Sequence, residues 1–371
     1  MKFIFWQNII SIHQSAFLKT LAEEHLVTLV AEQSMEVDRK SQGWNIPEMG
    51  KVEIILAPEM KQIYNLLENN SIHIFSGINA YSLINKGFKL AVKKNLRIGV
   101  ILEPFEWIGF KGKLRWIKYL LLGQRYKLNI NFILTTGCKG YFQYKSIGFH
   151  EKDIFEWGYF IDPLKASPQL SRKNRHTIKP SVLFVGRIDK NKNIDLLAEL
   201  INRHKNLIEK FTIIGDGPHK NKLKSKIEGL KQINYKGILP NNEVQKLMNE
   251  HDILILPSLY DGWGAVVNEA LNSGMQVIAS ENCGASILLD GVIRGEKFYF
   301  KGKNDLESVL LKWIGKGPVS VERRHEIKTW SQNHISGEVA ANYFSKIISF
   351  IYGESSYKPF APWMENQLTE N

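Results

Sequence analysis

The architecture of the chain follows from the stretch Ile253-Leu254-Ile255-Leu256-Pro257-Ser258-Leu259-Tyr260-Asp261-Gly262-Trp263-Gly264-Ala265-Val266-Val267-Asn268-Glu269-Ala270. Its first four residues are apolar and predict a buried parallel strand. The residues from Ala265 to Ser273 predict a helix that ends at Gly274, because glycine is a usual helix stop. A loop that joins such a strand to such a helix lies where open α/β sheets bind ligands.

The loop in this stretch predicts a site for an anion. Gly262 and Gly264 let backbone N–H groups come close to a ligand, and the start of the helix adds a partial positive charge. We therefore expect the loop from Gly262 through Trp263 and Gly264 to Ala265 to favour an anion such as a diphosphate. Glu269 lies further along the helix, where its carboxylate can accept hydrogen bonds from sugar hydroxyls. The alternative is an ordinary strand–loop–helix unit with solvated acids.

The two acids of this stretch, Asp261 and Glu269, are separated by seven residues. Their spacing resembles the E-x7-E signature of the retaining glycosyltransferases of family 4. The resemblance implies an α/β protein with the GT-B fold, in which two Rossmann-like doubly wound domains face an interdomain cleft. It also implies that the first acid lies near the donor sugar and that the second binds the ribose hydroxyls. Asp261 stands where the signature has Glu, so its carboxylate reaches one methylene less far, and the donor-sugar preference is left open.

Two cations follow the strand expected at 181–185. Arg187 comes directly after Gly186, and Lys192 lies five residues beyond Arg187. This segment resembles the family's G-R-x4-K motif, which implies that both cations hold the donor diphosphate. The chemistry agrees, because a leaving nucleoside diphosphate gains negative charge that fixed cations stabilise most in the transition state. The alternative is a pair of solvated loop cations.

Two further loops complete the nucleotide site by resemblance. Gly217 lies in Gly215-Asp216-Gly217-Pro218, which matches the family's G-x-G-P turn. Taken alone, this turn is also consistent with a tight strand–helix connection. Gly237 and Ile238 stand where relatives pass beside the nucleotide base and contact it largely through backbone atoms.

The composition is that of a globular protein. The 371 residues are 44% hydrophobic and 23% charged, which is enough chain for two domains. Cys138 and Cys283 are the only cysteines, so we expect no disulfide framework, no cysteine metal cluster and a reducing compartment. The formal net charge of +12 favours anionic partners, namely nucleic acid, anionic lipid or phosphorylated substrates. No nucleic-acid module is recognisable, so we expect no nucleic acid and favour a membrane surface.

The first half of the chain alternates strand-like and helix-like segments, as a doubly wound sheet does. Six strands are expected there, at residues 2–6, 26–31, 52–56, 72–76, 97–102 and 132–135. The polar, proline-punctuated run that follows predicts a linker. The expected domains are a Rossmann-like acceptor domain at 1–165, a linker at 166–180, a Rossmann-like nucleotide-sugar domain at 181–338, and a C-terminal helix and tail at 339–371 that cross back to the first domain.

Glu103 is the candidate acceptor-side residue. It follows the strand expected at 97–102, again a position where α/β sites collect residues. Relatives place acceptor-facing groups there, so we expect Glu103 to orient or deprotonate an acceptor hydroxyl. A solvated loop carboxylate is the alternative.

The segment from Trp107 to Lys127 contains no acidic residue. Lys111, Arg115 and Lys118 recur near helical spacing, and aromatic and leucine side chains lie between them. This pattern suits a helix on an anionic membrane surface. The alternative is a core helix with a solvated charged face. No stretch of the sequence approaches the ~20 apolar residues needed to span a bilayer.

Together these patterns predict a retaining hexosyltransferase that moves a sugar from a nucleotide sugar, of the UDP class, to an acceptor hydroxyl. By family analogy the acceptor is a glycan or lipid-linked glycan in polysaccharide or lipopolysaccharide assembly. We expect no metal requirement and a peripheral location on the cytoplasmic face of the membrane. The rivals are a GT-B sugar-nucleotide epimerase or phosphorylase, and a non-catalytic membrane adaptor on the same fold.

Overall fold

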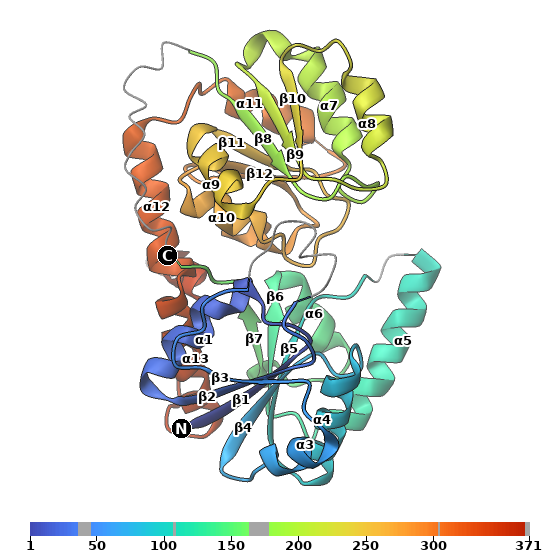
Figure 1. Ribbon diagram of the computed structural model, residues 1–371, viewed down its shortest axis with the longest axis vertical. Helices are drawn as coiled ribbons and strands as arrows, with labels where there is room; N and C mark the ends of the chain where they lie inside the picture. The colour runs from blue at the N-terminus through green and yellow to red at the C-terminus, as the bar shows by residue number, and fades with distance from the viewer. Residues whose placement is uncertain (36–45, 107–108, 163–177, 303–304, 368–371) are drawn as a thin grey trace. The chain divides into compact units, whose positions relative to one another are not determined.

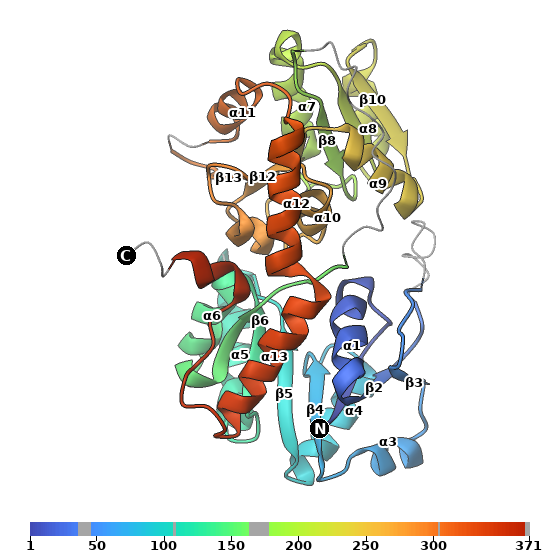
Figure 2. The same ribbon diagram turned by 90° about the vertical axis from the view of Figure 1, so that its left-hand side faces the viewer.

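The computed structural model describes residues 1–35, 46–106, 109–162, 178–302 and 305–367 (Figures 1 and 2). The chain divides into two compact units. Unit 1 contains the described residues up to Asp162 and those from His334 onward, and unit 2 contains the described residues between them up to Asn333. The chain thus returns to unit 1 near the end of helix α12 (Val321–Ile335). Most of the expected linker, residues 166–177, lies outside the described residues.

Unit 1 is built on a seven-stranded, entirely parallel sheet. Its strands are β1 (Lys2–Gln7), β2 (Leu26–Ala31), β3 (Glu53–Leu56), β4 (Ser71–Ser76), β5 (Arg97–Leu102), β6 (Phe132–Thr136) and β7 (Ile154–Trp157). Their order is β3-β2-β1-β4-β5-β6-β7, with β1 pairing both β2 and β4. The six strands expected from the sequence are present. The seventh, β7, was not expected, because it has only four residues and a glutamate interrupts its apolar run.

Helices cover both faces of this sheet. They are α1 (Ile12–Glu24), α3 (Met60–Leu66), α4 (Ser82–Lys93), α5 (Gly109–Tyr126), α6 (Gly137–Ser146) and α13 (Gly337–Ile351). On one face α13 lies beside α1 (Figure 2), and Phe344 of α13 packs edge-on against Phe17 of α1 with ring centroids 5.3 Å apart. On the other face, residues of α3, α4, α5 and α6 join Trp6 and Phe75 in a second buried cluster. Large aromatic side chains therefore fill both layers of the unit 1 core.

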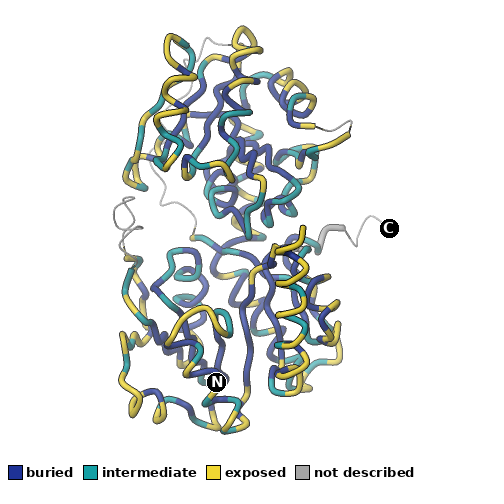
Figure 3. Tube along the Cα trace, turned by 90° about the vertical axis from the view of Figure 1, so that its right-hand side faces the viewer, coloured by how far each residue is buried: buried dark blue, intermediate teal, exposed yellow. Residues whose placement is uncertain are grey.

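Unit 2 repeats the plan with a six-stranded parallel sheet. Its strands are β8 (Val182–Val185), β9 (Phe211–Ile214), β10 (Ile233–Gly237), β11 (Ile253–Leu256), β12 (Gln276–Ser280) and β13 (Gly295–Phe298). Its helices are α7 (Ile194–Arg203), α8 (Lys220–Ile227), α9 (Asn241–Glu250), α10 (Val266–Asn272), α11 (Leu306–Ile314) and the greater part of α12. The strand order is β10-β9-β8-β11-β12-β13. Figure 3 shows buried trace through the interior of each unit. Most strands are buried, as their continuous apolar runs predict, whereas β3 and β10 at the sheet edges contain no buried residue.

Candidate functional site

The candidate nucleotide site lies at the carboxyl edge of the unit 2 sheet, where the strand order reverses. Strands β9 and β10 lie on one side of β8, and β11, β12 and β13 lie on the other. Loops that leave the sheet at such a point run in opposite directions and leave room for a ligand. All the residues nominated for the nucleotide site follow β8, β9, β10 or β11 or end one of these strands.

The loops after β8, β9 and β10 touch through their backbones. The N–H of Gly186 donates to the carbonyl oxygen of Ile214 at 3.0 Å, and the N–H of Gly215 donates to that of Gly237 at 2.8 Å. Gly215 has φ of +131°, and a Cβ at this position would overlap the carbonyl oxygen of Gly186. Glycine is therefore required where these loops approach each other. The three glycines form a surface of bare backbone at the edge of the sheet.

Gly217 and Ile238 lie on the same side of the site and differ in role. A Cβ on Gly217 would overlap the carbonyl oxygen of Ile188, whose N–H donates to Asp216 at 2.9 Å. Gly217 thus permits close contact between the loops after β8 and β9. Ile238, directly after β10, is 42% exposed, so its apolar side chain is available to a flat ring such as a base.

The loops after β11 and β12 also hold each other. The N–H of Asp261 donates to Asn282 at 3.0 Å, and the N–H of Gly284 donates back to Asp261 at 3.1 Å. Gly264 has φ of +89°, and a Cβ there would lie 2.6 Å from Sγ of Cys283. These contacts fix the backbone that leads from Gly262 to the start of α10.

The Trp263 side chain is part of the interior of this loop. It is 1% exposed, and its Nε1–H donates to Oδ1 of Asn268 at 2.7 Å. The Cys283 thiol donates to the Trp263 carbonyl oxygen at 2.9 Å. Any contribution of Trp263 to ligand binding is therefore confined to its backbone. Ala265 precedes α10 and gives that helix no side-chain cap.

Lys192 and Asp261 are brought together by the fold. Nζ of Lys192 forms an ion pair with Oδ2 of Asp261, and the two side chains are only 20% and 16% exposed. Two further hydrogen bonds join the turn after β8 to the loop after β11. Nδ2 of Asn191 donates to the carbonyl oxygen of Tyr260 at 2.7 Å, and the N–H of Leu259 donates to the carbonyl oxygen of Asn191 at 2.7 Å. Asn191 was not nominated from the sequence, where nothing distinguished it from the polar residues around it.

Arg187 and Glu269 are less constrained. The Arg187 side chain is 57% exposed, and its Nε lies 3.6 Å from Oδ2 of Asp189. The Glu269 carboxylate is partly buried and accepts no hydrogen bond from any residue that the structure describes. Burial raises the pKa of Glu269 to about 7. No hydrogen bond or ion pair among the described residues joins Arg187 or Glu269 to the Lys192–Asp261 pair. The four residues share a sheet edge, and an ion pair joins two of them.

The carboxyl edge of the unit 1 sheet holds a different cluster. The Tyr159 hydroxyl donates to Oε1 of Glu103 at 2.7 Å. The Tyr159 ring stacks on the His13 ring with centroids 5.0 Å apart and an interplanar angle of 3°. The hydroxyls of Ser76, which ends β4, and Thr136, which ends β6, are buried and have no hydrogen-bond partner among the described residues. Tyr159 was missed because the strand before it, β7, was missed.

Helix α5 carries residues 109–126 of the basic segment. Trp107 and Ile108 lie outside the described residues, and Lys127 follows the helix. The buried residues of α5 are Gly112, Gly123 and Tyr126. Four apolar side chains recur along it at helical spacing and are exposed, namely Phe110 (77%), Leu114 (52%), Ile117 (48%) and Leu121 (66%). An ordinary core helix would bury such a stripe. None of the described helices is long and apolar enough to span a lipid bilayer.

Comparison with known proteins gives a family match for the second half of the chain. Residues 179–330 match the family model described as glycosyl transferases group 1. The chain is 24% identical over 314 residues to an uncharacterized 41.2 kDa protein in the cps region of Klebsiella pneumoniae, with 82% of each chain covered. It is 30% identical over 127 residues, 33% of this chain and 35% of the other, to the Campylobacter jejuni GalNAc-α-(1→4)-GalNAc-α-(1→3)-diNAcBac-PP-undecaprenol α-1,4-N-acetyl-D-galactosaminyltransferase.

The fold is similar to that of solved glycosyltransferases. The crystal structure of Anabaena Alr3699/HepE in complex with UDP and glucose matches 94% of this chain and 99% of its own, with a TM-score of 0.67 and 13% sequence identity. Residues 179–330 are therefore a glycosyl transferases group 1 domain, and the chain has the GT-B fold.

Proposed function

We propose that this enzyme transfers a sugar, with retention at the anomeric carbon, from a UDP-sugar to a hydroxyl of a lipid-linked glycan in polysaccharide or O-antigen assembly. One observation carries the proposal. The Lys192–Asp261 pair joins the loops after β8 and β11, and the helix that follows carries Glu269, whose carboxylate accepts no hydrogen bond from the described residues. The UDP class is supported by the Anabaena structure, which holds UDP and glucose.

The cations act on the leaving group. As the bond between the anomeric carbon and the diphosphate oxygen breaks, the bonding electrons go to that oxygen, and UDP leaves with the added negative charge. The ammonium of Lys192 and the exposed guanidinium of Arg187 stabilise this charge, which is larger in the transition state than in the bound donor. Arginine can engage phosphate through two N–H groups at once, whereas lysine supplies a point charge.

The two acids hold the neutral parts of the donor. Glu269 accepts hydrogen bonds from the ribose hydroxyls, and these bonds satisfy a carboxylate that has no protein partner in the described residues. Asp261 lies beside the donor sugar and exchanges its contact with Lys192 for sugar hydroxyls when the diphosphate binds. Gly186, Gly217 and Gly237 let the nucleotide approach the backbone, while Ile238 packs against the base.

Glu103 acts on the acceptor side. It orients the attacking hydroxyl and takes its proton as the new glycosidic bond forms. The Tyr159 hydroxyl holds one carboxylate oxygen of Glu103 at 2.7 Å and leaves the other for the acceptor. The lipid-linked nature of the acceptor is supported by the Campylobacter relative, whose substrate name contains PP-undecaprenol.

Unit 1 docks on the cytoplasmic face of the membrane through α5. The exposed stripe of Phe110, Leu114, Ile117 and Leu121 enters the boundary between head groups and acyl chains. The basic side chains of the same helix meet anionic head groups, each contributing about 1 kcal/mol near the surface. A peripheral enzyme bound in this way is confined to the same membrane surface as a lipid-linked acceptor.

Membrane docking is tested by co-sedimentation with vesicles of phosphatidylglycerol and phosphatidylcholine. We expect the wild type to bind and the triple charge reversal Lys111→Glu, Arg115→Glu, Lys118→Glu to remain in the supernatant. A matched control reverses three lysines of α8, Lys220, Lys222 and Lys226, which lie in unit 2. Binding that survives the α5 reversal contradicts the docking proposal.

The donor is tested by thermal shift with a panel of nucleotide sugars and nucleoside diphosphates, because a ligand that binds only the folded state raises the melting temperature. We expect UDP and one or more UDP-sugars to raise it. We expect UDP to leave the melting temperature of the Lys192→Met variant unchanged. If neither UDP nor any UDP-sugar raises the melting temperature of the wild type, the UDP assignment is overturned.

The reaction class is tested by following UDP release from the donor identified in this way. A transferase releases UDP in proportion to acceptor, whereas an epimerase converts the donor without an acceptor and an adaptor does neither. Proton NMR of the product gives the anomeric configuration. An inverted configuration removes the retaining assignment and leaves the transferase standing.

A further inference from the structure

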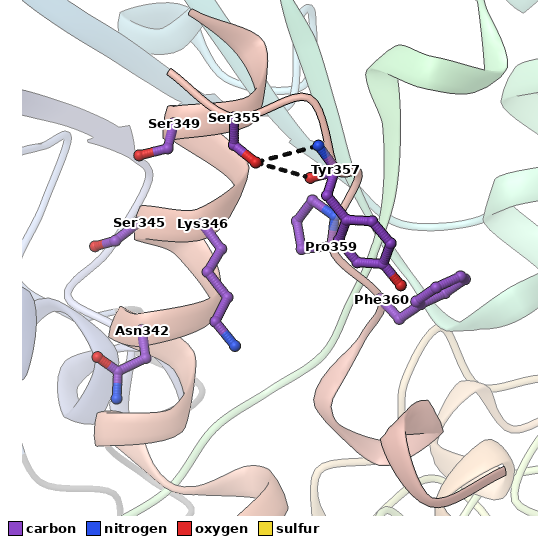
Figure 4. Close-up of a pocket in the computed structure, with 8 residues that line it drawn as sticks. All are labelled: Asn342, Ser345, Lys346, Ser349, Ser355, Tyr357, Pro359 and Phe360. Atoms are coloured by element: carbon purple, nitrogen blue, oxygen red, sulfur yellow. Dashed lines mark hydrogen bonds between the residues drawn. The ribbon is translucent and has the colours of Figure 1, made fainter. Parts of the chain in front are cut away.

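A groove of about 670 Å³ lies on unit 1 between α13 and the chain that follows it (Figure 4). Polar side chains of α13 form its first wall, and they are Asn342, Ser345, Lys346 and Ser349. Their spacing of three and four residues puts all of them on one face of the helix. This face supplies one amide, two hydroxyls and one ammonium.

Aromatic rings dominate the second wall, which the C-terminal segment forms. Tyr357 is 66% exposed and Phe360 is 42% exposed, and the two rings meet edge to face with centroids 6.1 Å apart. The N–H of Tyr357 donates to Oγ of Ser355 at 3.2 Å, which steadies the start of this wall. Figure 4 shows Lys346 extending from α13 toward the segment that carries both rings.

The second wall is anchored to the rest of unit 1. Nζ of Lys358 donates to the carbonyl oxygens of Glu151 and Ile154 at 2.5 and 2.8 Å. Further along, Trp363 is 6% exposed and its ring lies 6.1 Å from that of Phe160. The groove is therefore formed before any ligand arrives, and a ligand that binds it does not have to order its wall.

The lining has the mixed chemistry that a sugar requires. A pyranose presents C–H groups on its faces and hydroxyls around its edge. Exposed aromatic rings pack against the former, and the side chains of Asn342 and Ser345 hydrogen-bond to the latter. The Ser349 hydroxyl donates to Oε2 of Glu354 at 2.9 Å and can only accept from a sugar hydroxyl. An acyl chain would bury those polar groups unsatisfied, at a cost of roughly 1–3 kcal/mol each. Among the described residues of the lining the charged one is Lys346, and its ammonium favours an anionic substituent.

We infer that this groove binds an oligosaccharide segment of the acceptor glycan that carries a carboxylate or phosphate group. The inference rests on the glycan acceptor of the proposed function. It adds a second recognition site on unit 1, built from residues separate from Glu103 and its cluster. Such a site holds the growing glycan by sugars other than the one that accepts the new residue, and so it selects chains that already have a particular composition.

Binding is tested with the full chain and three probes: short oligosaccharides of polyglucuronate, of a phosphodiester-linked teichoic acid, and of neutral dextran. Saturation-transfer NMR and titration calorimetry measure the affinity. We expect at least one acidic probe to bind, and Tyr357→Ala to weaken it about tenfold, the scale of one aromatic contact. We expect Tyr357→Phe to bind as the wild type does, and Lys346→Met to lower affinity for the acidic probe toward that for dextran.

The matched control is Phe110→Ala, which removes another exposed ring of unit 1 outside the groove. It should leave probe binding unchanged. The inference is overturned if neither acidic probe binds the wild type, or if Tyr357→Ala binds as tightly as Phe110→Ala. The thermal shift with UDP, measured on the same samples, separates this result from the donor proposal. If UDP raises the melting temperature of Tyr357→Ala as much as that of the wild type, any loss of probe binding in this variant is due to the groove alone.

Discussion

The carboxyl edges of the two sheets differ in the kind of side chain they hold. The edge in unit 2 presents the charged residues Arg187, Lys192 and Asp261 around loops of bare glycine backbone. The edge in unit 1 presents Glu103 held by Tyr159, whose ring stacks on His13. The family match covers residues 179–330 and therefore falls on unit 2.

This difference agrees with the proposed roles of the two edges, which are donor binding in unit 2 and acceptor binding in unit 1. All donors of one class contain the same nucleoside diphosphate. The same arrangement of cations and glycine turns can therefore bind the donor in many enzymes. An acceptor varies from enzyme to enzyme, and a cluster of aromatic and polar side chains can vary with it. The variants described next test whether a change at one edge affects donor binding, turnover or both.

The largest effect is expected at Glu269. We expect Glu269→Gln to lower turnover by roughly 10²–10³-fold, because the neutral amide is a poorer acceptor for ribose hydroxyls than the carboxylate. Radiolabelled sugar transfer measures turnover, and circular dichroism checks the fold. Glu243→Gln on α9 is the matched control and should transfer normally. Full turnover in Glu269→Gln would remove this residue from the site.

Opposite effects are expected from the two halves of the ion pair. We expect Lys192→Met to weaken UDP binding by roughly 10–100-fold, the scale of a hydrogen bond to a charged group. We expect Asp261→Asn to tighten UDP binding while lowering turnover, because the lysine no longer has a competing carboxylate.

Titration calorimetry with UDP measures both variants. A loss of affinity of similar size in both would mean that the pair acts as a structural unit only, with no exchange between Asp261 and the diphosphate.

A smaller effect, confined to turnover, is expected in unit 1. Tyr159→Phe removes the hydroxyl that holds Glu103, and we expect kcat to fall about tenfold with UDP affinity unchanged. Tyr343→Phe is the matched control, because its hydroxyl donates to the Glu156 carbonyl at 3.0 Å in the same unit. Weaker UDP binding in Tyr159→Phe would show that the two edges are not separate in function.

The smallest effect is a pH dependence of stability. The pKa of Glu269 is raised from 4.5 to about 7, so the folded state holds this proton in a range where the unfolded state has lost it. The free energy of unfolding must then fall as pH rises from about 4.5 to 7, by roughly 3 kcal/mol for a fully buried group and by less here, because the carboxylate is partly exposed. Urea denaturation at pH 5 and pH 8 measures it. Glu269→Gln should lose this part of the pH dependence, and an unchanged profile would contradict the burial of the charge.

The sequence predicted most of unit 2 because its signals are local. Continuous apolar runs mark β8, β9, β11 and β12, and glycines mark the turns that follow. Elements without such signals were not expected. Helix α8 has four lysines in eight residues, and α12 has no clear apolar face. In both cases packing in the folded unit outweighs a weak local pattern.

The contacts within the site were less accessible to sequence reasoning. The motif named Lys192 and Asp261, which lie 69 positions apart, yet nothing in the sequence showed that they pair. Asn191 stands beside the motif residue Lys192, and Tyr159 follows the short strand β7. Neither residue belongs to a recognisable sequence pattern. Their roles depend on which loops the sheet order brings together.

The central claim is that the loops after β8, β9 and β11 hold the donor nucleotide, and amide hydrogen exchange with and without UDP tests it most directly. We expect UDP to slow exchange in segments 186–192, 215–217 and 261–269, with no comparable change at 103–106 or 157–160. Slower exchange confined to unit 1, or no slowing in those three segments at saturating UDP, would contradict the claim.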